Sequence, residues 1–297
     1  MQKRLIALAL LAGAVPALAH DKPIDKPIDK PIECGSCAAW NEAQAPFKLI
    51  GNTYYVGTRE LGAVLITGKQ GHILVDGALP QSAPLIEANI KQLGFKMRDI
   101  KLILNSHEHF DHAGGIPALQ RASGALVLAG AAGIKTLQSG VISSDDPQYD
   151  PNDLQRMPKI GRGRAVTDGE VVKLGNLRVT AHATPGHAPG GTTWSWQSCE
   201  NKVCADVVYA DSLTAVSADG FRFTEAHATR FNAVFDKVAA LKCDIVVAAH
   251  PVATGTIEAH AAAKPGVNPF MDPQGCRKLV DAARTRLAAR MEKDRAQ

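Results

Sequence analysis

The sequence lacks three features that would place it in common protein classes. After residue 19 no apolar run is long enough to cross a bilayer, so a membrane protein is not predicted. The formal net charge is only +4, and +2 without Lys3 and Arg4, which argues against a nucleic-acid or anionic-membrane partner. Neither Gly-x-Ser-x-Gly nor Ser-x-x-Lys occurs, which disfavours a hydrolase that acylates a serine.

The amino terminus has the pattern of an export signal. Lys3 and Arg4 give a basic start, an apolar stretch follows over residues 5–15, and Ala17-Leu18-Ala19 matches a signal-peptidase site. We therefore predict a signal peptide over residues 1–19. The mature protein is expected in the periplasm, which its six cysteines also favour.

A repetitive segment follows the signal. Three copies of Asp-Lys-Pro-Ile occupy residues 21–32, and repeated proline with alternating charge does not form a packed element. This predicts a flexible leader over residues 20–39. No linker-like segment divides the rest of the chain, so a single folded domain is expected over residues 40–297.

The most informative segment is His107-Glu108-His109-Phe110-Asp111-His112. It follows the apolar run 100–104, which has the look of a buried strand, and loops at strand ends are where α/β folds place their chemistry. His107 and His109, two residues apart, can converge on one metal ion. Asp111 and His112 can turn toward a second ion, so the segment predicts a dinuclear metal site.

Two further histidines have settings that suit metal ligands. His187 ends a Thr-Pro-Gly-His turn after a strand-like run, and His250 follows the apolar run 245–247. We assign His107, His109 and His187 to one ion, and Asp111, His112 and His250 to the other. Three protein ligands leave an open position, which is the catalytic pattern. Imidazoles with carboxylate support suit Zn²⁺, although Fe, Mn and Co accept the same ligand types.

These motifs together resemble the metallo-β-lactamase superfamily, and they are most similar to subclass B3. The segments that carry the resemblance are Tyr55–Thr58, Gly71–Gly77, Ser106–Gly115, Thr184–His187 and Tyr209–Leu213. Ser212 stands where the other subclasses have a cysteine ligand, and the B3 pattern recruits the histidine after the aspartate, here His112.

The resemblance implies a β-lactam hydrolase with two zinc ions per chain. A hydroxide held by the metals, and oriented by Asp111, would open the ring of penicillins, cephalosporins and carbapenems. By the same resemblance Ser212, Thr214 and Gln148 would contact the substrate. The expected partner is thus a small β-lactam molecule, with no nucleic acid or membrane, and the enzyme is expected to be a monomer.

Asp211 supports an alternative. In lactonases and thioesterases of the superfamily an acidic residue near this position bridges both metals, so a bridging Asp211 would indicate an ester, thioester or lactone hydrolase. A non-catalytic zinc-binding module is disfavoured, because six ligands with open coordination positions are not needed for structure.

The cysteine spacing predicts disulfides. Cys199 and Cys204 flank a short polar link between two strand-like runs, so a bridge there would close a hairpin. The B3 resemblance implies a second bridge between Cys243 and Cys276. Cys34 and Cys37 are left to pair with each other, to pair with another chain, or to stay free.

Apolar periodicity predicts short strands and helices in two similar halves. Strands are expected near residues 53–56, 63–67, 72–76, 101–105, 171–174, 177–183, 192–196, 207–209 and 244–248, and helices near 82–93, 115–122, 231–241 and the carboxyl terminus. The resemblance implies how these elements are arranged: an α/β fold of four layers, an αββα sandwich with two pseudo-symmetric halves and the metals along one edge.

Overall fold

The computed structural model describes residues 29–152 and 156–296. The predicted signal peptide and the first two Asp-Lys-Pro-Ile repeats lie outside these residues. Within them, no helix combines the length and the apolar character needed to cross a membrane.

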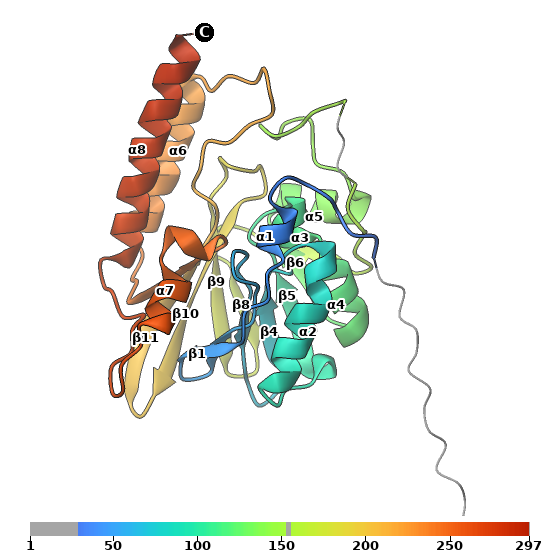
Figure 1. The fold of residues 1–297 in the computed structure, drawn as a ribbon, viewed down its shortest axis with the longest axis vertical. Helices are drawn as coiled ribbons and strands as arrows, with labels where there is room; N and C mark the ends of the chain where they lie inside the picture. Colours follow the sequence, from blue (N-terminus) through green and yellow to red (C-terminus); the bar gives the residue numbers. More distant parts are fainter. Residues whose placement is uncertain (1–28, 153–155, 297) are drawn as a thin grey trace, which may run out of the picture.

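Two β-sheets lie face to face at the centre of the fold (Figure 1). The larger sheet contains, in spatial order, β1 Phe47–Ile50, β2 Thr53–Tyr55, β3 Val64–Ile66, β4 His72–Val75, β5 Ile100–Leu104, β6 Leu126–Ala129 and β7 Gly163–Ala165. The smaller sheet contains β12 Ile245–Ala248, β11 Val203–Ala210, β10 Thr192–Glu200, β9 Leu177–Ala183 and β8 Val171–Leu174.

Helices cover the outer faces of both sheets (Figure 1). In the described residues the helices are α1 Cys37–Trp40, α2 Ala83–Gln92, α3 Phe110–Ala113, α4 Ile116–Ser123, α5 Ala131–Ser139, α6 Glu225–Ala239, α7 Thr256–Ala261 and α8 Gly275–Arg295, with 3-10 turns at Pro80–Ser82, Met97–Asp99 and Pro251–Ala253. The apolar sides of α2, α4 and α5 pack on the larger sheet, and those of α6 and α8 pack on the smaller one. The predicted αββα sandwich is confirmed.

Alternation along the strands explains the layers. In β11, Val207 and Tyr209 face the space between the sheets, whereas Val208 and Ala210 face α6 and α8. A stretch of strand buried on both faces has to be apolar, as residues 207–210 of β11 are. On α6, Phe231, Val234, Phe235 and Val238 form the predicted buried stripe.

Each half of the chain contains a strand, a helix and a second, parallel strand. In the first half β4 and β5 are parallel and connected through α2, and in the second β11 and β12 are parallel and connected through α6. A buried aspartate directly follows the first strand of each pair, Asp76 after β4 and Asp211 after β11. The carboxyl ends of these strands therefore present acidic and imidazole side chains at one edge of the sandwich.

The end of the predicted leader packs on the domain. The Gln81 side chain forms hydrogen bonds with both the N–H (3.2 Å) and the carbonyl (2.7 Å) of Ile32. Cys37 is buried in the cluster under α2, and the Trp40 ring lies 5.5 Å from that of His250. Some residues before the predicted boundary at residue 40 thus contact the domain, and sequence repeats do not reveal these long-range contacts.

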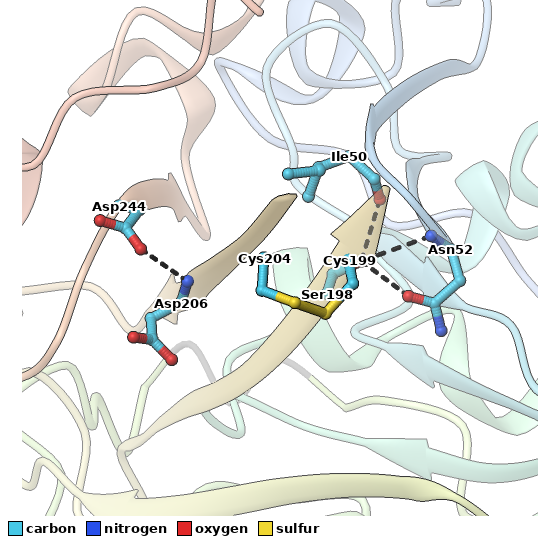
Figure 2. The surroundings of a disulfide bond; sticks show 7 residues. All are labelled: Ile50, Asn52, Ser198, Cys199, Cys204, Asp206 and Asp244. Atoms are coloured by element: carbon cyan, nitrogen blue, oxygen red, sulfur yellow. Dashed lines mark hydrogen bonds between the residues drawn. A yellow bond between two sulfur atoms is a disulfide. The ribbon is translucent and has the colours of Figure 1, made fainter. Parts of the chain in front are cut away.

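Three disulfides join the six cysteines, and both expected pairs are among them. Cys199 and Cys204 lie directly opposite each other across the β10–β11 hairpin, as Figure 2 shows. Beside them the Ser198 hydroxyl contacts the Ile50 carbonyl at 3.1 Å, which ties the hairpin to the end of β1 (Figure 2). Of the alternatives for Cys34 and Cys37, the structure has the bond between the two.

The Cys243–Cys276 disulfide connects the start of α8 to the segment before β12. The two cysteines are 33 residues apart in the sequence. Replacing both cysteines with alanine is expected to lower the free energy of unfolding by about 3–4 kcal/mol, because the unfolded chain gains entropy. The matched Cys199/Cys204 double variant opens a loop of only 5 residues, so about 2 kcal/mol is expected. Urea denaturation measures the free energy of unfolding of both variants. An equal loss in the two, or a larger loss in the Cys199/Cys204 variant, contradicts this prediction.

Candidate metal centre

The six predicted ligands meet at the edge where β5, β9 and β12 end. His107 and His109 lie in the loop after β5, and Asp111 and His112 lie on the short helix α3, which begins one residue later. His187 and His250, which complete the set, follow β9 and β12. All are buried except His250, whose side chain is 30% exposed.

Three imidazoles form a first pocket. One ring nitrogen from each of His107, His109 and His187 lies within 4.8 Å of the others. His109 Nδ1 and His187 Nε2 are only 3.2 Å apart. His107 Nε2 is buried and has no hydrogen-bond partner among the described residues. Three convergent nitrogens, one of them unpartnered, fit a cation better than a hydrogen-bond network.

The outward nitrogens of these rings have acceptors. His107 Nδ1 lies 2.8 Å from Asp211 Oδ1, and His187 Nδ1 lies 2.9 Å from the Thr214 carbonyl. His109 is oriented the other way round, because its outward nitrogen is Nε2, and this atom lies 2.9 Å from a carboxylate oxygen of Asp146. An acceptor on one ring nitrogen keeps the proton there and leaves the inward nitrogen's lone pair free for a metal.

A second pocket adjoins the first. Asp111 Oδ2 lies 3.1 Å from His112 Nε2 and 3.3 Å from His250 Nε2, and these two nitrogens are 3.2 Å apart. The outward Nδ1 of His250 faces the carbonyl of Glu60 at 3.2 Å, while the buried Nδ1 of His112 has no partner among the described residues. The pockets are neighbours, since the His107 and His112 ring centroids are 4.3 Å apart.

The pKa values of three of the donors favour metal binding, whereas that of His109 is raised, since the Asp146 carboxylate outweighs the effect of burial. Burial and the neighbouring His112 hold the pKa of His107 well below its usual range, and burial with His109 lowers the pKa of His187 to about 3. Burial raises the pKa of Asp111, but His112 and His250 outweigh it and hold that pKa well below its usual range. Neutral imidazoles and an ionised carboxylate are the forms that bind metals.

Buried carboxylates hold the ligand loops. Asp76 accepts hydrogen bonds from the Ser106 N–H and hydroxyl, from the Asn105 amide and from the Tyr209 hydroxyl, and so fixes the backbone just before His107. Glu108 turns away from the pockets, and its Oε1 accepts the Gly190 N–H at 2.9 Å. This joins the loop after β5 to the loop that carries His187.

The three residues expected at the substrate differ in their surroundings. Gln148 Nε2 lies 3.3 Å from His109 Nδ1 and 3.4 Å from His187 Nε2, so its side chain points at the first pocket. The Thr214 hydroxyl lies 3.0 Å from His187 Nδ1. The Ser212 N–H donates to Asp211 Oδ1 at 2.8 Å, and Ser212 is 9% exposed.

Sequence reasoning missed Asp146 and the Thr214 carbonyl as partners of the ligand rings. Asp146 is 37 residues from His109 in the sequence, inside an irregular loop. Its only local signal is its place two residues before Gln148, which does not distinguish it from neighbouring acids such as Asp145.

The αββα sandwich with paired donor clusters at one edge defines the chain as a metal-dependent hydrolase by fold and site. A family model described as "Metallo-beta-lactamase superfamily" matches residues 63–250, and the chain belongs to this superfamily.

Solved structures of subclass B3 enzymes are similar over nearly their whole length. MEM-A1, a subclass B3 metallo-β-lactamase from a soil metagenome library, is 50% identical with a TM-score of 0.83, covering 86% of this chain and 99% of that one. The Rm3 metallo-β-lactamase is 47% identical with a TM-score of 0.85, covering 89% of this chain and all (100%) of that one.

Curated relatives match over a shorter span. The hydroxyacylglutathione hydrolase of Maricaulis maris is 36% identical over 91 residues, which is 31% of this chain and 27% of that enzyme. The chain thus aligns with about a quarter of this curated relative.

Proposed function

We propose that this chain is a zinc-dependent β-lactam hydrolase that binds two zinc ions, one in each pocket. The observation that carries the proposal is the adjacency of two three-donor pockets, with His107 close enough to contribute to either donor group. The similarity to MEM-A1 and Rm3 over almost their full lengths supports the β-lactam ring as the substrate.

The donor set fits zinc. Five imidazoles and one carboxylate form a nitrogen-rich donor set of the kind zinc accepts, and the first pocket, with three imidazoles, leaves a coordination position free. Zinc bound there would supply Lewis acidity, which activates water near neutral pH and polarises a carbonyl.

The protein's own groups would position the reactants. Asp111, the one anionic donor of the six, orients the attacking water from its place beside His112 and His250. Gln148 reaches the substrate from the loop over the first pocket, and Ser212 and Thr214 present hydroxyls to its carboxylate. Penicillins, cephalosporins and carbapenems all carry the amide carbonyl and carboxylate that this arrangement would recognise.

A thioesterase or lactonase is the second candidate, and the hydroxyacylglutathione hydrolase matches favour it. It would use Asp211 as a ligand between the two metals. The Asp211 carboxylate instead contacts His107 Nδ1, the Ser212 N–H and the Thr184 hydroxyl, on the outer side of the His107 ring. This placement supports the β-lactamase over the alternative.

We further propose that the enzyme works as a monomer in the periplasm. Three disulfides suit an oxidising compartment. The export signal that the sequence predicts is consistent with this location.

Substrate assays on the purified mature protein test the proposal. Nitrocefin turnover is expected to disappear with a chelator and to return with zinc. The matched comparison uses S-lactoylglutathione and a homoserine lactone at the same enzyme concentration. If either is cleaved with a much higher kcat/KM than nitrocefin and a carbapenem, the alternative function replaces the proposed one.

A further inference from the structure

The loop between α5 and β7 contains a buried carboxylate with two separate contacts. Asp146 is only 2% exposed, although its neighbour Asp145 is exposed. One of its oxygens lies 2.9 Å from His109 Nε2. The other accepts the backbone N–H of Gln148 at 2.8 Å, which forms the turn that aims Gln148 at the first pocket.

We propose that Asp146 is a positioning residue that selects Nδ1 as the metal-binding atom of His109 and couples the loop to the first pocket. The inference rests on the proposed metal function and deepens it. Asp146 touches neither the metal position nor the substrate, because His109 lies between; it acts through the ring of His109.

Ring geometry explains why His109 needs such a partner. His109 turns Nδ1 toward His187, whereas the nitrogen that His187 presents is Nε2. Nδ1 is bonded to the ring's attachment carbon, and a half-turn of the ring about the Cβ–Cγ bond would put a carbon, Cδ2, in its place. A hydrogen bond from Nε2 to a fixed carboxylate restrains that rotation and keeps the proton on Nε2.

The carboxylate also supplies charge that the other loop contacts lack. Among the described residues, the outward nitrogen of His187 meets a neutral carbonyl and a hydroxyl, both of Thr214, and that of His250 meets the Glu60 carbonyl. The first pocket contains no carboxylate ligand of its own. Asp146 and Asp211, each on the outer side of one ring, therefore add negative charge to that of Asp111 in the adjoining pocket.

Backbone contacts hold Asp146 in place independently of His109. Its N–H donates to the Ser143 carbonyl at 3.0 Å, and its carbonyl accepts from the Tyr149 N–H at 3.0 Å. The next residue, Pro147, accepts from the Ala218 N–H at 2.9 Å, which joins the loop to the segment that carries Thr214. Two segments that support two different ligands of the first pocket are thus connected.

Zinc titration of the metal-stripped full-length mature protein tests this role. Asp146→Asn retains the shape and one acceptor oxygen but loses the charge, and it is expected to weaken one of the two zinc sites about 10–100-fold. Asp146→Ala is expected to weaken the same site further. Asp145→Asn, the matched control one residue away, is expected to leave both affinities unchanged, since that side chain is exposed. A competing chromophoric chelator measures the affinities, and circular dichroism checks the fold.

Double variants identify the affected site. Combined with His187→Ala, Asp146→Asn is expected to add little further loss of affinity, because both changes act on the first pocket. Combined with His250→Ala, the two losses should be independent, each confined to its own site.

Unchanged zinc binding by Asp146→Asn and Asp146→Ala overturns the proposed role of Asp146, and so does an Asp146→Asn loss that is additive with His187→Ala. A wild-type protein that binds zinc but cleaves no β-lactam contradicts the proposed substrate and leaves this inference standing. A wild-type protein that binds no zinc overturns both.

Discussion

Asp111→Asn is expected to lower kcat for nitrocefin about 10²–10⁴-fold, the range typical for loss of a group that handles a proton or orients the nucleophile. Asp111 is the only anionic member of the six-residue donor set, and its Oδ2 lies within 3.3 Å of both His112 Nε2 and His250 Nε2. Asparagine presents a neutral oxygen to the metal or an N–H that repels it. The loss is therefore electrostatic and does not depend on a change of shape.

The measurement is kcat and KM at saturating zinc, so that weakened metal binding is separated from slower chemistry. Asp219→Asn serves as the control, because Asp219 is exposed and its substitution removes the same charge from the protein. Circular dichroism should superimpose for all three proteins. A zinc-saturated Asp111→Asn enzyme that retains more than a tenth of the wild-type kcat is incompatible with the role assigned to Asp111.

Asp76→Ala is expected to lower the free energy of unfolding by at least about 2 kcal/mol, because the Ser106 N–H and the Asn105 amide lose their acceptor and each such buried donor costs about 1–3 kcal/mol. Four donors converge on this fully buried carboxylate: the Ser106 N–H and hydroxyl, the Asn105 amide and the Tyr209 hydroxyl. Asp76 also has φ of 60°, a conformation that alanine adopts at a cost. Tyr209 belongs to the smaller sheet, so the loss loosens the connection between the sheets.

Urea denaturation with and without zinc measures this effect. Asp76→Asn, which retains an acceptor oxygen and tolerates the same φ, is expected to lose less than Asp76→Ala. Asp281→Ala on the exposed face of α8 controls for the loss of an acidic side chain. If the three variants unfold at the same urea concentration, Asp76 does not hold the two sheets and the ligand loop together as the hydrogen bonds indicate.

Strands and helices with a clear run or repeat of apolar residues were predictable from the sequence. The apolar runs of β4, β5 and β12 and the stripe on α6 were all recognisable, because each depends on residues close in the chain. β6 and α5 were missed, although Leu126-Val127-Leu128 is as apolar as β5. What defines β6 as a strand is its pairing with β5 and β7, which residues close in the chain do not reveal.

The candidate site was also predictable in part. All six proposed ligands were named from their types and from their places after strand-like runs, and the structure brings them together in two adjoining pockets. The partners of the rings were not predictable. Asp146 and the Glu60 carbonyl reach His109 and His250 across 37 and 190 residues of sequence.

By itself, the sequence determined which residues are the candidate ligands and that they follow strands, since residue type and the short-range apolar repeat are local properties. The tertiary structure alone decided which nitrogen of each ring faces inward, and that Asp211 lies on the outer side of His107. Those choices depend on contacts between residues far apart in the chain, and only the packing of the two sheets and their loops sets these contacts.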